Sequence, residues 1–261
     1  MRKSTRRRLT QGVLYLLLVG AGLVLALIAD WEAINENFFD IDILRTLWPE
    51  IITVGAKNTV VYTAIAFGGG LALALVLALM KMSPVGPYRW LATLYIEFFR
   101  GLPALIVIVF FGLGIPLAFQ WQPPGGFAGA GVLALIVVSA AYMAETLRAG
   151  IQAVPKGQTE AARSLGMSGA WTMVSVILPQ AFRVVIPPLT NEFVLLIKDT
   201  ALLSVVGAQA SERELTTYAR DMMSGAANPT PLIAAAVMYL IITLPLTRLV
   251  AWMEKRQQRA R

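Results

Sequence analysis

The sequence predicts an all-α integral membrane protein with about six transmembrane helices. Of its 261 residues, 57% are hydrophobic and only 14% are charged, whereas soluble domains carry about 25% charged residues. Apolar runs of about 20 residues, the length that a bilayer-spanning helix needs, recur along the chain. Between these runs, Lys and Arg gather in alternate connecting segments. These observations point to a bilayer rather than to a large soluble core.

Six apolar runs have the length of a span, at about 11–29, 53–80, 102–119, 127–149, 180–206 and 231–253. The first run follows a basic head at residues 2–8. A cleaved signal peptide is the alternative interpretation, because Val24, Leu25 and Ala26 could form a small-residue cleavage site. The apolar run continues to Ala29, however, so we expect a retained helix.

Two segments between the runs are amphipathic. Segment 30–50 mixes aromatic residues with acids and is expected on the outer surface. In segment 83–101, aromatic residues interleave with Arg89, Glu97 and Arg100, which is typical of a helix at the headgroup level. Gly101 and Pro103 then allow a turn into the bilayer. The alternative is one long tilted helix whose Arg100 extends to the membrane surface.

The Lys and Arg distribution predicts the orientation of the spans. With a cytoplasmic N-terminus, the basic segments 2–8, 81–89, 148–163 and 255–261 all fall inside, and the C-terminus is cytoplasmic too. The outer segments are then 30–50, 120–126 and 207–230. A net charge of +7 therefore reflects topology, and we expect no nucleic-acid partner. Three regions result: an N-terminal region at 1–50, a transmembrane domain at 51–253 and a basic tail at 254–261.

The polar loop at about 154–172 has the composition of a docking element. Ala161 and Ala162 are small, and Gly166 lacks a side chain at a turn, so a partner could approach the backbone closely. Ser168 is placed to cap a following helix. Pro155 and Pro179 are expected to bracket the loop as a compact, rigid unit. The alternative is an ordinary helix–turn–helix connection.

This loop resembles the signature loop of ABC-importer membrane subunits. In that family Glu-Ala-Ala and a Gly four residues later precede Ile/Val-x-Leu-Pro, and the matching residues here are Glu160, Ala161, Ala162, Gly166, Val176, Leu178 and Pro179. Segments 144–150, 154–158, 178–183, 187–193 and 196–202 resemble the polar-amino-acid branch. So do 57–59 and 99–103, where Leu102 replaces the usual Thr. The first 50 residues depart from the shortest members.

The resemblance implies a type I ABC-importer permease fold in a bacterial plasma membrane. It also implies a set of partners: a dimer of ATPase subunits gripping the loop, a second permease subunit, identical or related, membrane lipid, and an extracytoplasmic binding protein. The implied substrate is a polar amino acid, with glutamate, glutamine and basic amino acids all open.

The fifth run contains four polar residues in an otherwise apolar stretch, namely Asn191, Glu192, Lys198 and Asp199. Ionised groups in a bilayer normally face a cavity or a partner, because exposing them to lipid is costly. Asn191 and Lys198 share a helix face with Leu195, which could line a substrate pathway. The alternative for Lys198 and Asp199 is that they pair at a helix break.

Three further charged residues are candidates for the pathway. Glu145 and Arg148 lie three residues apart near the inner end of the fourth run, either as a gating pair or as an ordinary helix pair. Arg100 precedes the third run. Gly68, Gly69 and Gly70 lie in the middle of the second run and are expected to allow close helix packing.

The sequence also excludes several classes of site. It contains no Cys and no His, which rules out disulfides, Cys/His zinc sites and His-based triads, and we expect no metal or cofactor. No Gly-x-x-x-x-Gly-Lys-Ser/Thr occurs, so ATP must be hydrolysed by a separate subunit. The alternatives are a secondary amino-acid transporter driven by an ion gradient and a membrane enzyme acting through Glu145, Glu192 or Asp199.

Overall fold

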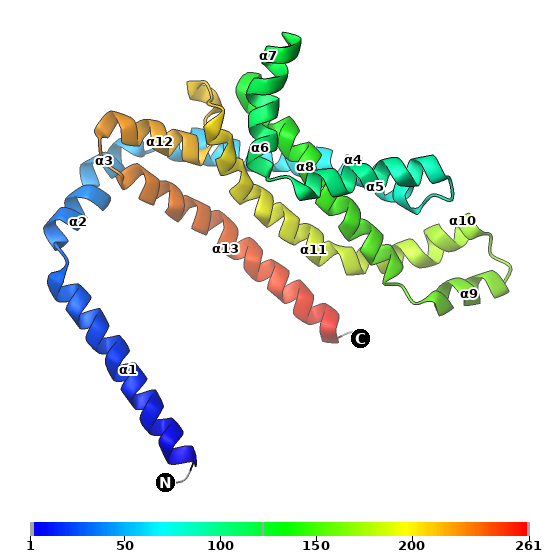
Figure 1. The fold of residues 1–261 in the computed structure, drawn as a ribbon, viewed down its shortest axis with the longest axis horizontal. Coiled ribbons are helices and arrows are strands. Elements are labelled where there is room, and N and C mark those ends of the chain that lie inside the picture. Colours follow the sequence, from blue (N-terminus) through cyan, green and yellow to red (C-terminus); the bar gives the residue numbers. More distant parts are fainter. Residues whose placement is uncertain (1–2, 122, 260–261) are drawn as a thin grey trace.

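The computed structural model describes residues 3–121 and 123–259, and every regular element among them is a helix. Figure 1 shows the long helices of the chain gathered in one bundle, with the N-terminal helix α1 projecting away from it. Five helical stretches in this part of the chain are long and apolar enough to cross a membrane, at 11–28, 51–82, 126–152, 169–205 and 230–257. A bent pair of helices makes a sixth if the pair crosses as one span, and five to six spans agree with the predicted number of about six.

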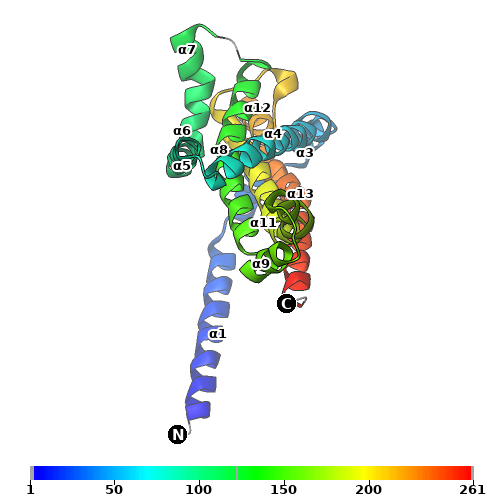
Figure 2. The same cartoon turned by 90° about the vertical axis from the view of Figure 1, so that its right-hand side faces the viewer.

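The N-terminal region consists of a separate long helix and two short ones. Helix α1 (Lys3–Ile28) has no buried side chain between residues 11 and 28, and Figure 2 also shows it apart from the bundle. Helices α2 (Trp31–Phe38) and α3 (Ile41–Leu47) form the predicted amphipathic segment. Asp30 and Asp40 cap them by accepting hydrogen bonds from backbone N–H groups. The predicted basic residue Arg2 and the tail residues 260–261 lie outside the described residues.

Helix α4 (Lys57–Met82) continues the π-helical turn η1 (Ile51–Ala56) and packs along α8 (Gly126–Gln152). Glycines make this contact close. A Cβ on Gly70 would lie 2.3 Å from Ser139 Oγ, and one on Gly69 would lie 2.8 Å from Ile136 Cδ1. Close packing is therefore confirmed for these two glycines. A Cβ on Gly68, by contrast, would meet no atom of another element within 4 Å.

The third span is bent where the sequence predicts a turn. Helix α5 (Gly86–Gly101) meets the stretch formed by α6 (Ala104–Val109), η2 (Phe110–Gly114) and α7 (Ile115–Phe119) at 102°. Leu102 is extended, with φ −99° and ψ 139°, because a residue before proline is driven away from helical angles. The alternative of one long tilted helix is therefore wrong.

Helix α8 is the central element of the bundle. Of the residues in its apolar window, 67% are buried, which is more than in any other candidate span of the described chain. Its small and apolar side chains join two core clusters, one with α6, η4 and α11 and one with α4, α5 and α11. The final turn of α8 leads directly into the predicted docking loop. Movement of that loop would therefore act on the best-packed helix.

The structure corrects the expectation that Pro179 brackets the docking loop. Helix α9 (Lys156–Ser164) is followed by a turn at 165–168. From there the chain is helical without a break through α10 (Gly169–Thr172), η3 (Met173–Ile177), α11 (Leu178–Asp199) and the 3₁₀ turn η4 (Thr200–Val205). Pro179 therefore lies in the first turn of α11 and does not end the loop. A proline cannot donate the usual backbone bond, and the preceding π-helical turn accommodates that loss.

The predicted outer segment 207–230 is mostly structured. It contains a short turn, η5 (Ala210–Glu212), and helix α12 (Leu215–Ala226), which packs on the last helix, α13 (Thr230–Arg259). In both cartoon views, the α9–α10 region and the C-terminal end of α13 lie at one end of the bundle (Figures 1 and 2). Helices α2, α3 and α12 lie at the other end. The segments predicted to be inside and outside are thus separated in space.

Candidate functional site

A compact helical hairpin, residues 156–172, projects from the bundle. Pro155 precedes α9, whose Ala162 is buried while Glu160 and Ala161 are exposed. Gly166 adopts φ +82° in the turn, and a Cβ there would meet no atom within 4 Å. The turn thus requires the conformational freedom of glycine and leaves the backbone open to a partner.

Hydrogen bonds order the turn and the start of the second arm of the hairpin. Arg163 Nη1 donates to the carbonyl of Met167 at 2.6 Å, which closes the turn. Ser168 Oγ accepts from the backbone N–H of Trp171 at 3.3 Å and caps α10 as predicted. Leu178 is partly buried and Pro179 is exposed. The hairpin therefore has a defined shape before any partner binds it.

The hairpin exposes large apolar side chains as well as small ones. Leu165 is 84% exposed and Trp171 is 62% exposed, one on each side of Gly166. Apolar side chains presented on a rigid turn are typical of a protein contact. The sequence motif does not reveal these two residues, because Leu and Trp also occur in helices that face lipid.

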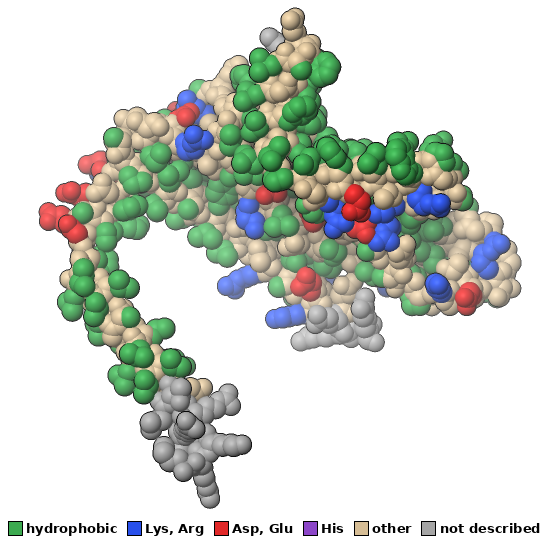
Figure 3. Space-filling view, in the orientation of Figure 1, with side chains coloured by type: hydrophobic (Ala, Val, Ile, Leu, Met, Phe, Trp, Pro, Cys, Tyr) green, Lys and Arg blue, Asp and Glu red, His purple; other side chains and the backbone are tan. Residues whose placement is uncertain are grey.

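Glu145 and Arg148 belong to a charge cluster that also contains Lys81 and Glu97. Lys81 Nζ lies 3.1 Å from Glu145 Oε2 and 3.9 Å from Glu97 Oε1. Arg148 Nε donates to Glu145 Oε2 at 3.1 Å, and its Nη2 binds the other carboxylate oxygen. The cluster joins α4, α5 and α8 just before the hairpin, where Figure 3 shows basic and acidic side chains together among apolar ones.

Asn191 and Lys198 lie on one exposed face of α11 together with Leu195. Glu192 and Asp199 are partly buried on a neighbouring face. Neither Lys198 nor Asp199 forms an ion pair with a described residue. The predicted common face of Asn191 and Lys198 is thus present, and the ion pair between neighbours is not.

Arg100 lies at the bend between α5 and α6 and contacts α8. Its guanidinium Cζ is 5.7 Å from the centre of the Tyr142 ring. The Tyr142 hydroxyl donates to the Arg100 carbonyl at 3.4 Å. Such a cation–π contact is worth about 0.5–1 kcal/mol when exposed, and it ties the bend to the central helix.

A buried carboxylate, Glu214, was not found by sequence reasoning. It is 1% exposed and accepts bonds from the backbone N–H groups of Thr216 and Thr217, both at 2.6 Å, and from the Tyr239 hydroxyl at 3.0 Å. Glu214 therefore caps α12 and links it to α13. The Glu-x-Thr-Thr pattern is compatible with a helix cap, but the partner on α13 is distant in sequence.

Comparisons with known proteins agree with this architecture. Residues 70–259 match the family described as binding-protein-dependent transport system inner membrane components. A probable glutamine ABC transporter permease protein of Bacillus subtilis is 38% identical over 208 residues, 79% of this chain and 93% of the relative. An arginine transport system permease protein of the same organism is 40% identical over 183 residues, 68% of this chain and 79% of the relative.

A solved structure shares both fold and sequence. The crystal structure of an amino acid ABC transporter with histidines has a chain that is 39% identical to this one. The TM-score is 0.74, and the match covers 82% of this chain and 96% of the other. The family match begins at residue 70, so α1, α2 and α3 lie outside it.

Proposed function

This chain belongs to the binding-protein-dependent transport system inner membrane components, and from that membership we propose that it is the permease subunit of an ATP-driven importer for a polar amino acid. It is a transport subunit rather than an enzyme, since its relatives are permease proteins. The observation that carries the mechanism is the rigid, exposed hairpin at residues 156–172. The ion-gradient carrier considered from the sequence receives no support from these relatives.

Membership of the family implies an ATPase and a substrate-binding protein as partners. We place the ATPase contact at Glu160, Ala161, Ala162 and Gly166, with Leu165 and Trp171 filling an apolar pocket on that partner. Because α8 enters the hairpin and α11 leaves it, closure of two ATPase subunits would move both helices. Partner binding would then shift the balance between inward-open and outward-open states.

We place the substrate pathway along the exposed face of α11, at the contact with a second permease subunit. Asn191 and Lys198 offer hydrogen-bond donors and an acceptor, and Glu192 and Asp199 lie beside them. Groups of both signs suit a zwitterionic amino acid. Exposed polar groups on a membrane-spanning helix are stable only against a cavity or a partner, which a second subunit would provide.

The charge cluster and Arg100 would control the inner end of this pathway. Glu145 already forms ion pairs with Lys81 and Arg148. Opening of the inner end of the pathway would therefore require these ion pairs to break as the helices move. We assign both chain ends to the cytoplasm of a bacterial cell, on the same side of the membrane as the hairpin. The relatives transport glutamine and arginine by name, and we assign the present substrate to the same polar class.

Reconstitution tests this function directly. The permease would be placed in liposomes with its ATPase and the binding protein, and uptake of radiolabelled L-glutamine, L-arginine and L-glutamate would be measured. We expect uptake of at least one that requires ATP and both partners and survives an ionophore. Uptake that continued without the ATPase, driven by an ion gradient, would reject the proposal.

A further inference from the structure

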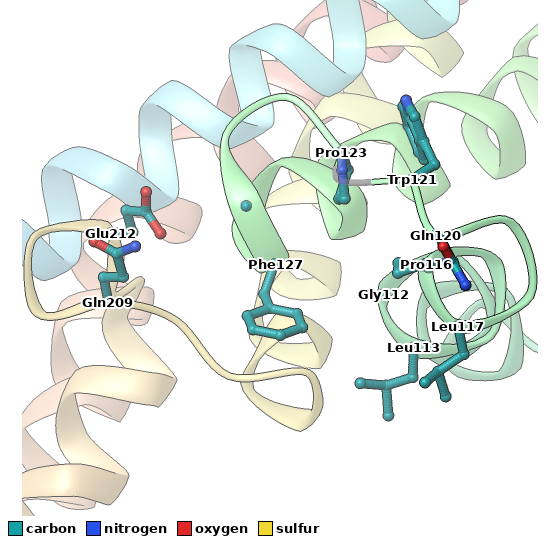
Figure 4. Close-up of a pocket in the computed structure, with 11 residues that line it drawn as sticks. Gly112, Leu113, Pro116, Leu117, Gln120, Trp121, Pro123, Phe127, Gln209 and Glu212 are labelled. Carbon is teal, nitrogen blue, oxygen red and sulfur yellow. The ribbon is translucent and has the colours of Figure 1, made fainter.

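A cavity of about 900 Å³ lies between α7, the start of α8 and the segment 207–214. Its walls are mostly apolar and include Leu117 and Phe127. Its polar groups are Gln120 on the α7 side and Gln209 and Glu212 on the opposite side, with Phe127 between them (Figure 4). Small-molecule sites commonly have this character, with an apolar lining, a few polar groups and about 300–1,000 Å³ of space.

Helix α4 holds the backbone on the Glu212 side of the cavity. Asn58 Nδ2 donates to the carbonyls of Ser211 at 2.8 Å and Arg213 at 3.0 Å. The Tyr62 hydroxyl donates to the carbonyl of Glu212 at 2.9 Å. Two side chains one helical turn apart thus hold three consecutive residues at the end of the short turn η5. The backbone at Glu212 is therefore held in place before any ligand arrives.

The carboxylate of Glu212 is available for a ligand. It forms no ion pair with any described residue. A Cβ on Gly126 would lie 3.8 Å from Glu212 Oε2, so the carboxylate is close to the N-terminus of α8, where the helix dipole favours its negative charge. Among the described lining residues, Glu212 is the ionisable one. A carboxylate without an ion-pair partner among the described residues, in a largely apolar cavity, is complementary to an ammonium group.

We propose that this cavity is an entry site that binds the α-ammonium group of an amino acid at Glu212, before the molecule reaches α11. The Gln209 amide beside Glu212 would donate to the substrate carboxylate, and Phe127 would cover the aliphatic part of its side chain. The inference rests on the proposed transport of a polar amino acid. It assigns a second site, on elements other than the α11 face.

The site explains why α4 carries Asn58 and Tyr62 at the same level as the 207–214 segment. Each of these side chains donates its hydrogen bonds to that segment rather than to its own helix. Without them, an irregular chain with exposed carbonyls would be free to move, and Glu212 would lose its fixed place beside α8. We infer that the hydrogen bonds from Asn58 and Tyr62 serve to present the Glu212 carboxylate to the cavity.

Protection from chemical labelling tests the site. The chain has no Cys, so Leu117→Cys gives a single thiol in the cavity wall, at a position that is 82% exposed. The complex of permease and ATPase in lipid nanodiscs, without binding protein, would be treated with a maleimide in the presence of L-glutamine, L-arginine or L-glutamate. We expect the amino acid that is taken up in the transport assay to slow labelling.

Three further comparisons identify the ammonium contact. Glu212→Gln in the Leu117→Cys background should raise the concentration for half protection about tenfold, as expected for loss of one charge-assisted hydrogen bond. Glu36→Gln, an exposed acid on α2, should leave it unchanged. The 2-hydroxy acid analogue of the protecting amino acid, which lacks the ammonium group, should not protect.

Several results would overturn the proposal. Absence of protection in a complex that transports the amino acid would remove the entry site while leaving the proposed function intact. Equal protection after Glu212→Gln, with normal recovery of the ATPase, would remove the role of Glu212. A Leu117→Cys thiol that does not react in the assembled complex would show that the cavity is closed there and cannot serve as an entry site.

Discussion

Lys81 and Glu145 join the last turn of α4 to α8 through a contact of 3.1 Å between Lys81 Nζ and Glu145 Oε2. The Lys81 side chain is 17% exposed and that of Glu145 is 24% exposed, so water screens the pair less than a surface ion pair. Arg148 binds the same carboxylate from the next turn of α8. Glu145 therefore holds two cations, one on its own helix and one on a helix far away in sequence.

Replacing Lys81 with Met should loosen this junction. A hydrogen bond to a charged group contributes about 1.5–3 kcal/mol, and because Arg148 remains on Glu145, we expect a loss near the lower end. The purified complex should melt at a lower temperature and couple ATP hydrolysis to uptake less tightly. A double-mutant cycle with Glu145→Gln should show that the two losses are not additive.

Arg45 supplies the matched control for Lys81. It pairs with Asp42 at 3.2 Å, but the two side chains are 76% and 90% exposed, and such surface pairs contribute little. Arg45→Met should therefore melt and transport like the native chain. If Lys81→Met behaved in the same way, the contact between Lys81 and Glu145 would have no structural role.

Gly166 should be the most sensitive position of the hairpin. Its φ of +82° is unfavourable for any residue with a Cβ, by about 1–2 kcal/mol, and a larger side chain would block the approach of the ATPase. Gly166→Leu should therefore insert into the membrane but recover less ATPase on purification. Substrate-stimulated ATP hydrolysis should be lost.

Gly157 is the control for this experiment. It lies inside α9, where a Cβ meets no atom within 4 Å, and Ala is a better helix former than Gly. Gly157→Ala should keep both ATPase recovery and stimulated hydrolysis. Normal values of both in Gly166→Leu would reject the assignment of the hairpin as the coupling contact.

Apolar runs and breakers were sufficient to predict the spans and the bend at 101–103. The bend follows from local chemistry, since Pro103 restricts Leu102 whatever surrounds it. The continuous helix through Pro179 was missed because a Leu-Pro pair also ends many helices, and only the preceding π-helical turn allows the chain to continue. Local signals thus predict where a helix can stop, not whether it does.

Contacts between side chains on different helices could not be predicted from the sequence. Lys81 is the last-turn basic residue of α4, and nothing near it in sequence identifies Glu145, 64 positions away. The same holds for Glu214 and Tyr239, whose contact depends on how α12 lies on α13. By contrast, the shared face of Asn191 and Lys198 was predictable, because helical spacing alone places them together.

Single cysteines test the predicted topology, because the chain has none of its own. Ser164→Cys lies at the end of α9 and Ser224→Cys lies on α12, and both serines are exposed. With the hairpin in the cytoplasm, an impermeant maleimide added to intact cells should label position 224 and not position 164. Labelling of position 164 from outside would show that the bundle has the opposite orientation in the membrane.

Asn191 provides the test of the substrate pathway. It lies 12 residues beyond Pro179, about 18 Å along a helix at 1.5 Å per residue. If the apolar part of the span begins near Pro179, as the sequence predicts, we expect Asn191 near the middle of a hydrocarbon layer about 30 Å thick. Its side chain is exposed. An amide in that position needs a partner, which a passing amino acid would supply.

Asn191→Leu should therefore reduce uptake while assembly and basal ATP hydrolysis stay normal, because Leu has a similar size and no polar group. Thr190→Val is the neighbouring control. The Thr190 hydroxyl already donates to the Ile186 carbonyl at 2.8 Å, so its removal should leave uptake unchanged. Uptake would be measured with saturating binding protein, so that delivery is not limiting. If Asn191→Leu transported at the native rate, the amide would serve packing between subunits, and the pathway would have to follow another face of α11.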